Sequence, residues 1–355
     1  MNEIDAAMTP ALPDTVTCSA ASHDPSAQVA QGLTDLMTHA DPAIREIAFD
    51  GLVRSAGGLS RENWSFDATW ADNTGTHAHR LMLIRDAAGT LLKTERSREF
   101  AVLKALEDSR VPAPKVHWVD AKGRWLGAPS VVMERMPGIC DYMILNGSRT
   151  LVSRLSLARD FIELMANIHA ADWRTHGLGE TLGLPDGSPS VHELEHWEGE
   201  YQTAKLEPQP ELDYILKWLK KNAPEAASIV LVHGDFKPGN ALVDDGRITA
   251  KLDWETAHLG DPLEDLGWVT NPVRKREHQI TGHWEQRHIV EAYSALTGLS
   301  IRETDLLWWN LFSCWKLCVI QLTAVSEFVG GNYNRVFQTP TWLFRPMLRM
   351  IEAAS

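Results

Sequence analysis

The side chains with the clearest potential for chemistry lie in the segment VHGDFKPGN, which contains His233, Asp235, Lys237 and Asn240. A second carboxylate, Asp253, follows thirteen positions after Asn240. Transfer of a phosphoryl group from a nucleotide needs a group that orients a hydroxyl and accepts its proton, and oxygen ligands that hold Mg²⁺ against the phosphates. Carboxylate and amide oxygens suit Mg²⁺. Asp235, Asn240 and Asp253 together offer both functions.

A hairpin is the element that would bring the second carboxylate back to this loop. The apolar runs at 241–243 and 248–252 flank an Asp-Gly pair at 245–246, and Asp-Gly is a preferred sequence for a two-residue turn. Antiparallel pairing of the two runs returns Asn240 and Asp253 to the same end of the hairpin. We therefore expect both side chains to converge with the carboxylate of the loop.

The spacing of the loop also matches a known arrangement. His233, Asp235 and Asn240 stand as in the protein-kinase catalytic loop H-R-D-x-x-x-x-N. This interpretation makes Asp235 the catalytic base, and Asn240 and Asp253 the magnesium ligands. Lys237, also catalytic, would reach the transferred phosphate. Glycine in place of the arginine of H-R-D argues against a protein kinase switched by phosphorylation of its activation loop.

The elements that position the loop fall into two groups. From about 50 to 136 the sequence indicates five short strands around an amphipathic helix at 95–107, with Leu81, Leu83 and Arg85 alternating along one strand. Helical patterns dominate later in the chain. These patterns predict an α+β fold with a β-rich N-terminal lobe and a mainly helical C-terminal lobe.

Three parts of the chain follow from this division. Residues 1–50 are interpreted as an acidic arm with a short helix, because they hold eight acidic side chains and a single arginine. Residues 51–136 are the predicted nucleotide-binding N-lobe. Residues 137–355 are the predicted C-lobe, which would carry catalysis and acceptor binding.

The chain resembles the aminoglycoside phosphotransferase/choline kinase superfamily, in particular the branch similar to the kinase-like domain of acyl-CoA dehydrogenase fusions. The resemblance is carried by HGDFKPGN at 233–240, LDWETA at 252–257, GDPLEDLG at 260–267, GGLS at 57–60, REF at 98–100 and VVME at 131–134. It implies a bilobal protein-kinase-like fold, ATP and Mg²⁺ as cofactors, and a small hydroxylated molecule as the acceptor.

The resemblance also implies a phosphate-binding part of the N-lobe. Gly57, Gly58 and Ser60 would form the loop over the ATP phosphates, where missing side chains let backbone N–H groups approach. Arg85 stands where kinases place a strand lysine, and Glu99 stands where its ion-pair partner would be. Lys93 is the rival of Arg85, and Glu95 is the rival of Glu99.

Further residues take roles from the same resemblance. Glu134 and Met136 would bond the adenine edge through backbone groups at the hinge between the lobes. Asp261 and Asp265 are expected to brace the catalytic loop or cap a helix. Glu255 could face the substrate. The tryptophans at 308, 309 and 315 are expected in helix core, with an aromatic wall for the acceptor as the alternative.

The identity of the acceptor stays open at this level. The resemblance favours a hydroxy acid or a hydroxyacyl-CoA, and a basic run at 274–276 could serve such an anionic molecule. An antibiotic phosphotransferase, acting on an aminoglycoside or a macrolide, is the alternative. A nucleotide-binding pseudokinase is the alternative of another class, although the predicted base and both metal ligands are present.

The composition of the chain limits the kinds of molecule that it is expected to bind. The 355 residues carry 34 Lys plus Arg and 47 Asp plus Glu, a net charge of −13 that disfavours binding to nucleic acid. The apolar stretch 306–324 contains Lys316, so we expect a buried helix and no membrane span. The four cysteines form no CxxC pair, and the N-terminus has no apolar signal segment. We therefore expect a cytoplasmic protein; its oligomeric state stays open.

Overall fold

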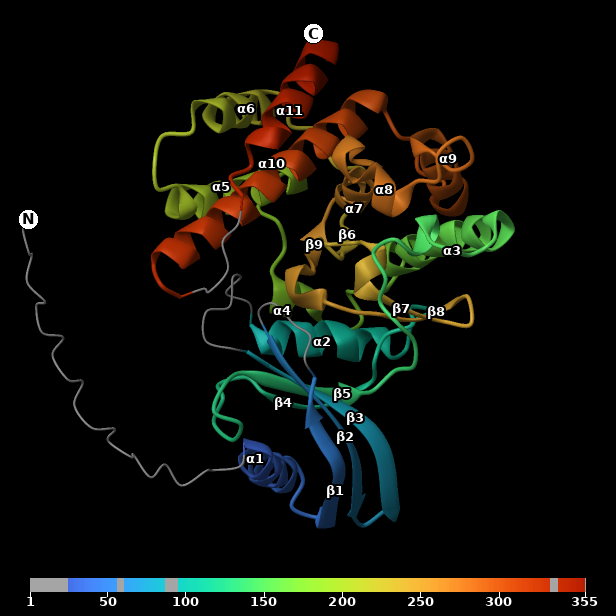
Figure 1. Cartoon of the computed structure of the whole chain (residues 1–355), viewed down its shortest axis with the longest axis vertical. Helices are drawn as coiled ribbons and strands as arrows, with labels where there is room; N and C mark the ends of the chain where they lie inside the picture. The colour runs from blue at the N-terminus through green and yellow to red at the C-terminus, as the bar shows by residue number, and fades with distance from the viewer. Residues whose placement is uncertain (1–24, 56–60, 87–94, 333–337, 355) are drawn as a thin grey trace, which may run out of the picture.

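A five-stranded sheet and a larger group of helices make up the two lobes of the protein (Figure 1). The computed structural model describes residues 25–55, 61–86, 95–332 and 338–354. The sheet lies at one end of the molecule and most helices lie at the other. This arrangement confirms the predicted α+β fold with a β-rich N-lobe and a helical C-lobe.

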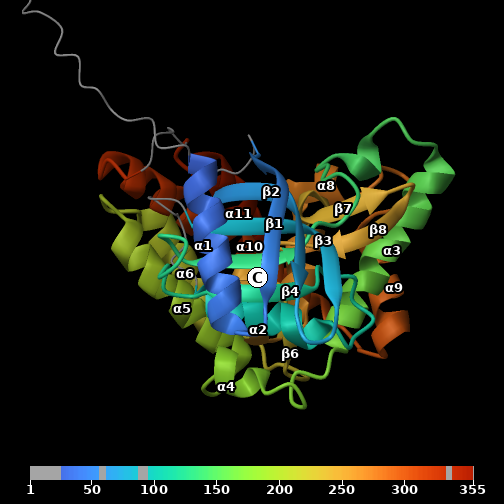
Figure 2. The ribbon, with the colours of Figure 1, turned by 90° about the horizontal axis from the view of Figure 1, so that it is seen from below.

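The N-lobe is an antiparallel sheet in the order β1-β2-β3-β5-β4. Its strands are β1 (Arg45–Arg54), β2 (Arg61–Ala71), β3 (Thr76–Asp86), β4 (Val116–Asp120) and β5 (Ser130–Glu134). Two helices flank it, α1 (Pro25–Ala40) and α2 (Arg96–Leu106). Helix α1 lies on the outer side of the sheet and α2 lies between the sheet and the helical lobe (Figures 1 and 2). Five strands and one inner helix match the prediction.

Side chains on β3 alternate between the two faces of the sheet, as strand geometry requires. Leu81 and Leu83 are fully buried in the outer core, where α1 contributes Leu33 and Met37. The next residue along from Leu83, Ile84, packs on the opposite face, which looks toward the helical lobe. Odd-numbered residues of this strand therefore face α1, and even-numbered residues face the space between the lobes.

Helix α1 and strand β1 correct the predicted division of the chain at residue 50. Strand β1 runs through that position, and α1 packs into the outer core of the sheet. Residues 25–50 therefore belong to the N-lobe because they complete its apolar core.

The C-lobe surrounds two small pairs of strands. Strand β6 (Val230–Val232) pairs with β9 (His258–Gly260), and β7 (Ala241–Asp244) pairs with β8 (Arg247–Lys251) as the predicted hairpin. The helices around them are α3 (Leu151–His169), α4 (Leu178–Leu182), α5 (Pro189–Ala204), α6 (Pro210–Lys221), α7 (Leu263–Thr270), α8 (Lys275–His278), α9 (Gln286–Thr297), α10 (Glu303–Val329) and α11 (Thr341–Ala353).

Helix α10 runs through the core of the C-lobe. Among the described residues it alone is long and apolar enough, by length and composition, to cross a membrane, and half of its most apolar window is buried inside the protein. Trp308, Trp309 and Trp315 are fully buried in the core cluster. Lys316 is buried beside them and donates to Glu264 Oε1 at 2.9 Å. These contacts confirm the expected buried helix.

Helices α7 and α10 approach each other closely at Gly267. A β-carbon at this position would lie 2.6 Å from the Cβ of Trp309 and 2.9 Å from its carbonyl carbon. No side chain fits at such distances, so the absence of one sets the spacing of the two helices. This matters for function because α7 carries Asp265, which contacts the catalytic loop.

We predict that Gly267→Ala lowers the free energy of unfolding by about 1–3 kcal/mol, because the added methyl group overpacks the α7–α10 contact. Gly199→Ala is the matched control, since this helical glycine of α5 has open space around it. The control should raise stability by about 0.5–1 kcal/mol. Urea unfolding followed by circular dichroism measures both, and equal stability of the two variants would contradict the close contact.

Candidate active site

The predicted catalytic loop follows β6 and places Asp235 next to Lys237 and Asn240, which line the cleft between the lobes. Asp235 Oδ2 accepts hydrogen bonds from Lys237 Nζ and, at 2.9 Å, from Asn240 Nδ2. Asp235 Oδ1 is buried and has no hydrogen-bond partner within the described ranges. A buried carboxylate oxygen without a donor is costly, so this atom is suited to a donor that a ligand brings.

Charge around Asp235 keeps its carboxylate ionised. Burial by itself raises the pKa of Asp235, but the cations of Lys237 and Arg274 outweigh burial and hold this pKa well below its usual range. The same contact raises the pKa of Lys237 against the effect of its own burial. The site therefore presents a carboxylate that can accept a proton, next to a fixed positive charge.

Asp265 holds the catalytic loop through hydrogen bonds to the loop backbone. Its Oδ2 accepts from the backbone N–H of His233 at 2.8 Å, and its Oδ1 accepts from that of Gly234 at 2.9 Å. His169 Nε2 lies 3.1 Å from Oδ2. Burial raises the pKa of Asp265, but the hydrogen bond and charge of His169 outweigh it and lower the pKa to about 2.

Asp261 forms separate hydrogen bonds at the start of α7. Its Oδ1 accepts from the N–H of Leu263 at 2.8 Å, and its Oδ2 accepts from Trp309 Nε1 at 3.3 Å. The bracing and capping predicted for Asp265 and Asp261 are therefore both present.

The hairpin brings Asn240 and Asp253 to the same end, as predicted. The N–H of Leu252 donates to the carbonyl of Asn240 at 2.8 Å, and His233 Nε2 lies 3.0 Å from the carbonyl of Leu252. Asp253 has a positive φ of 67°, a conformation that costs free energy for a non-glycine residue and is often found at functional sites.

These side chains fit a Mg²⁺ ion by their chemistry. Asn240 uses its Nδ2 to bond Asp235, which leaves its Oδ1 for a cation. Asp253 contributes a carboxylate whose Oδ1 lies 2.9 Å from the guanidinium of Arg61. A carboxylate and an amide oxygen are ligands that a hard cation accepts, and the cation would share the Asp253 carboxylate with the guanidinium of Arg61.

A cleft of about 750 Å³ opens between the lobes above these residues. Ile84 and Met133 line it from the sheet, Leu103 lines it from α2, and Leu252 and Asn240 line it from the catalytic region. An apolar cavity with magnesium-type ligands at one end has the form that a nucleotide requires.

Arg85 does not lie in this cleft, which corrects a sequence prediction. It bonds Glu62 and, at 3.0 Å, the carbonyl of Leu126. Arg85 shares its face of β3 with Leu81 and Leu83, whereas Ile84 faces the cleft. The alternation noted in the sequence already contained this answer, because it placed Arg85 in register with residues of the outer core.

The predicted ion pair between Arg85 and Glu99 is therefore wrong. Glu99 is buried and lines the cleft, but it pairs with Arg96, which also contacts Asp86. Glu95, its rival, is exposed. The phosphate-loop residues Gly57, Gly58 and Ser60, and Lys93, the rival of Arg85, lie outside the described residues.

Arg61 is a cleft residue that the sequence reasoning missed. It stands on β2 and contacts Asp253 and Glu255 on the other lobe, so it joins the two lobes. Burial lowers the pKa of Arg61, but the carboxylates of Asp253 and Glu255 outweigh it and raise the pKa above the usual value. A clue was present, because Arg61 directly follows the predicted phosphate loop.

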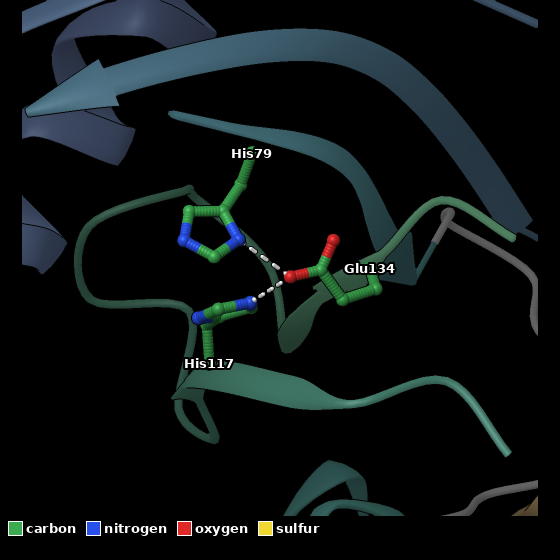
Figure 3. A group of neighbouring side chains, drawn as sticks. All are labelled: His79, His117 and Glu134. Carbon is green, nitrogen blue, oxygen red and sulfur yellow. Dashed lines mark hydrogen bonds and ion pairs between the residues drawn. The ribbon is translucent and has the colours of Figure 1, made fainter. Parts of the chain in front are cut away.

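The adenine contacts predicted for Glu134 and Met136 remain a prediction. The N–H of Glu134 donates to the carbonyl of Lys115 at 2.8 Å, which leaves the Glu134 carbonyl for a ligand. The side chain of Glu134 turns to the outer face of the sheet, toward His79 and His117 (Figure 3). Its role at the hinge would therefore be carried by backbone alone.

A second, smaller pocket of about 180 Å³ lies on the other side of Asp235. Trp197, Trp268 and Arg274 line it together with Asp235, Lys237, Glu255 and Lys316. Trp308, Trp309 and Trp315 do not line it, because they point into the helix core, as the sequence favoured. The aromatic residues at this pocket come instead from α5 and α7, whose contribution no sequence pattern had indicated.

The basic run at 274–276 divides between two sites. Arg274 faces the pocket of Asp235, and Glu277 Oε2 accepts from it at 2.6 Å. Lys275 and Arg276 line a separate hollow of about 650 Å³, which also contains Arg287.

Comparison with known proteins adds to this geometry. The model of the phosphotransferase enzyme family (APH) matches residues 60–300. The chain belongs to this family. That range contains the catalytic loop, the hairpin and most of the cleft between the lobes.

Several relatives show what the chain is similar to. It is 29% identical over 197 residues to acyl-CoA dehydrogenase family member 10 of Mus musculus, an alignment covering 53% of this chain and 18% of the relative. It is 29% identical over 254 residues to member 11 of Rattus norvegicus, covering 66% of this chain and 32% of that one. The chain therefore spans a third or less of their length. A hygromycin-B 4-O-kinase of Escherichia coli is 33% identical over 132 residues, covering 37% of this chain and 31% of the kinase.

Solved structures support the fold. A candidate aminoglycoside phosphotransferase from Ralstonia eutropha matches with a TM-score of 0.68 at 20% identity, covering 90% of this chain and 96% of that one. A thermostable variant of aminoglycoside phosphotransferase APH(4)-Ia, solved with ADP and hygromycin B, matches with a TM-score of 0.58 at 15% identity, covering 90% and 98%. The bilobal kinase-like fold is thereby confirmed.

Proposed function

We propose that this protein transfers the γ-phosphoryl group of ATP to a hydroxyl group of a small molecule. The observation that carries the proposal is the state of Asp235, whose Oδ2 is held by Lys237 and Asn240 while its buried Oδ1 has no donor among the described residues. An acceptor hydroxyl would supply that donor. The family membership and the cleft on the other side of Asp235 support the same function.

Residues of both lobes take part in the proposed reaction. Asp235 Oδ1 accepts the hydroxyl hydrogen bond and takes the proton as the acceptor oxygen bonds to the γ-phosphorus and ADP leaves. Lys237 offsets negative charge beside the transferred group. Asn240 and Asp253 would hold Mg²⁺, which supplies positive charge against the phosphates when bound. Arg61, on the N-lobe, contacts the carboxylate of Asp253.

For the acceptor we favour an anionic molecule, a hydroxy acid or a hydroxyacyl-CoA. The pocket beside Asp235 contains Arg274, whose buried Nε has no hydrogen-bond partner within the described residues. A carboxylate or a thioester oxygen would satisfy that donor. Lys275, Arg276 and Arg287 line a separate hollow and could receive a more distant phosphate group of CoA.

An antibiotic acceptor is the second candidate, because a hygromycin-B kinase is among the relatives. A cationic aminoglycoside needs an excess of carboxylates around it. In the pocket, three acidic residues (Asp235, Asp253 and Glu255) are matched by three basic ones (Lys237, Arg274 and Lys316). This balance is the reason that an anionic acceptor is favoured.

We predict that Asp235→Asn lowers kcat by about 100-fold or more, because the amide cannot take the proton of the hydroxyl. ATP binding, measured by calorimetry, should persist, since the cleft residues are unchanged. Asp244→Asn, at an exposed position of the hairpin, is the matched control and should keep full activity. Undiminished turnover in Asp235→Asn would overturn the assignment of the base.

Arg274→Gln tests the acceptor class. With hydroxy acids and hydroxyacyl-CoAs, we predict that kcat/KM falls about 10–100-fold, the effect of losing a hydrogen bond to a charged group. Arg345→Gln, at an exposed position of α11, is the control. Phosphorylation is read as the mass gain of the acceptor. Transfer to aminoglycosides or macrolides alone would favour the antibiotic alternative, and ATP binding without any transfer would favour a pseudokinase.

A further inference from the structure

A second cluster of chemically active side chains lies on the outer face of the N-lobe sheet. His79 on β3, His117 on β4 and Glu134 on β5 come from three neighbouring strands. His79 Nδ1 lies 2.7 Å from Glu134 Oε1, and His117 Nε2 lies 2.8 Å from the same oxygen (Figure 3). Two imidazole nitrogens and a carboxylate oxygen thus meet at one point.

The register of the sheet explains why they meet. Leu81 of β3 pairs with Glu134, and Val116 of β4 pairs with Met133 on the other side of β5. His79 lies two residues before Leu81 and therefore shares its face of β3. A register shift in β4 falls between Val116 and Trp118, at His117 itself. Such an irregularity can redirect a side chain, and here the side chain of His117 reaches Glu134.

Aromatic rings fix the orientation of the two imidazoles. Trp70 stacks on His79 with centroids 4.9 Å apart and planes at 19°, and it meets His117 edge-on at 6.2 Å. Trp118 lies 5.2 Å from the His117 ring. Rings held in this way lose little freedom when their nitrogens bind a ligand, which favours a defined coordination geometry.

The cluster keeps partial access to solvent. The side chains of His79, His117 and Glu134 are 29%, 12% and 23% exposed, so an ion can enter and a water molecule can complete its coordination. In the described part of the chain, the ion pairs of Glu134 involve these two histidines and no lysine or arginine.

A similar cluster in the C-lobe differs in having a lysine beside its carboxylates. Glu193, His258 and Glu264 also bring their ligand atoms within 4.8 Å of one another. Lys316 Nζ, however, stands between the two carboxylates, 2.9 Å from Glu264 Oε1 and 3.7 Å from Glu193 Oε1. A built-in cation therefore already offsets the charge of these two carboxylates. At His79, His117 and Glu134, the described residues include no lysine or arginine that pairs with the carboxylate.

We propose that His79, His117 and Glu134 bind a Zn²⁺ ion, with a water molecule as the fourth ligand. Two imidazole nitrogens and one carboxylate oxygen are a donor set that zinc accepts, at bond lengths of about 2.0–2.2 Å. Tetrahedral ligands at that length lie about 3.3 Å apart. The nitrogens must therefore retreat from Glu134 Oε1 by about half an ångström, which rotamer adjustment can supply.

The ion would tie together the three neighbouring strands β3, β5 and β4. Glu134 ends β5 and is followed directly by the segment that enters the C-lobe. The zinc site lies on the opposite face of the sheet from Asn240 and Asp253. It is therefore separate from the magnesium site, and its role is to stabilise the N-lobe.

The test uses the full chain without an affinity tag, treated with EDTA and dialysed. Zn²⁺ alone is titrated by calorimetry, and Co²⁺ is followed by visible absorption. We expect one equivalent of either ion, a tetrahedral cobalt spectrum, and no displacement by excess Mg²⁺. His117→Ala and the size-conserving His117→Gln should weaken Zn²⁺ binding by more than about 100-fold, since loss of a mere outer-shell partner already costs about 10–100-fold.

His283→Ala, at an exposed position of the C-lobe, is the matched control and should bind as the parent chain does. Circular dichroism checks that each variant is folded. No saturable binding by the parent chain would overturn the proposal, and so would undiminished binding by a folded His117→Gln variant. If neither His117 variant folds, the cobalt spectrum of the parent chain decides, and a six-coordinate oxygen-type spectrum overturns the site.

Discussion

The buried carboxylate of Asp265 is the contact on which the geometry of the active site depends. It accepts hydrogen bonds from the backbone N–H groups of His233 and Gly234, and so fixes the two residues that directly precede Asp235. Its own position is set from both sides. His169 contacts it from α3, and the close approach at Gly267 holds α7 against α10. The packing of apolar helices in the core of the C-lobe thereby helps to determine where the carboxylate of Asp235, the proposed catalytic base, stands.

Several charged side chains around this fixed loop pair with one another. Lys237 and Asn240 hold one oxygen of Asp235 and leave the other for an acceptor. Arg61 carries positive charge from the N-lobe to Asp253 and Glu255, which links the sheet to the catalytic region. Lys251 lies fully buried beneath the loop and donates to the carbonyl of Asn240 at 3.2 Å, and burial lowers its pKa to about 7.

The sequence predicted well the features that depend on local pattern. The strand and helix periodicities carried enough information for the two-lobed fold. The Asp-Gly pair carried enough for the hairpin that brings Asn240 and Asp253 to one end, and their roles stay predictions. It was harder to predict which face of a strand points toward the cleft and which points toward the outer core. Arg85 was assigned by position along the strand, and its parity with Leu81 and Leu83 sends it to the outer face. Arg61, Trp197 and Trp268 reach the site only through packing between distant segments, which no local period reveals.

The central claim, that Asp265 sets the geometry of the catalytic loop, is tested most directly by the turnover of Asp265→Asn. Asparagine has the same shape but a single acceptor oxygen, so its NH₂ group would face a backbone N–H of His233 or Gly234 and leave it without a partner. The account predicts that kcat falls by about tenfold or more while ATP binding, measured by calorimetry, is retained, since a lost buried hydrogen bond to a charged group costs about 1.5–3 kcal/mol. Unchanged kcat in a folded Asp265→Asn protein would contradict it.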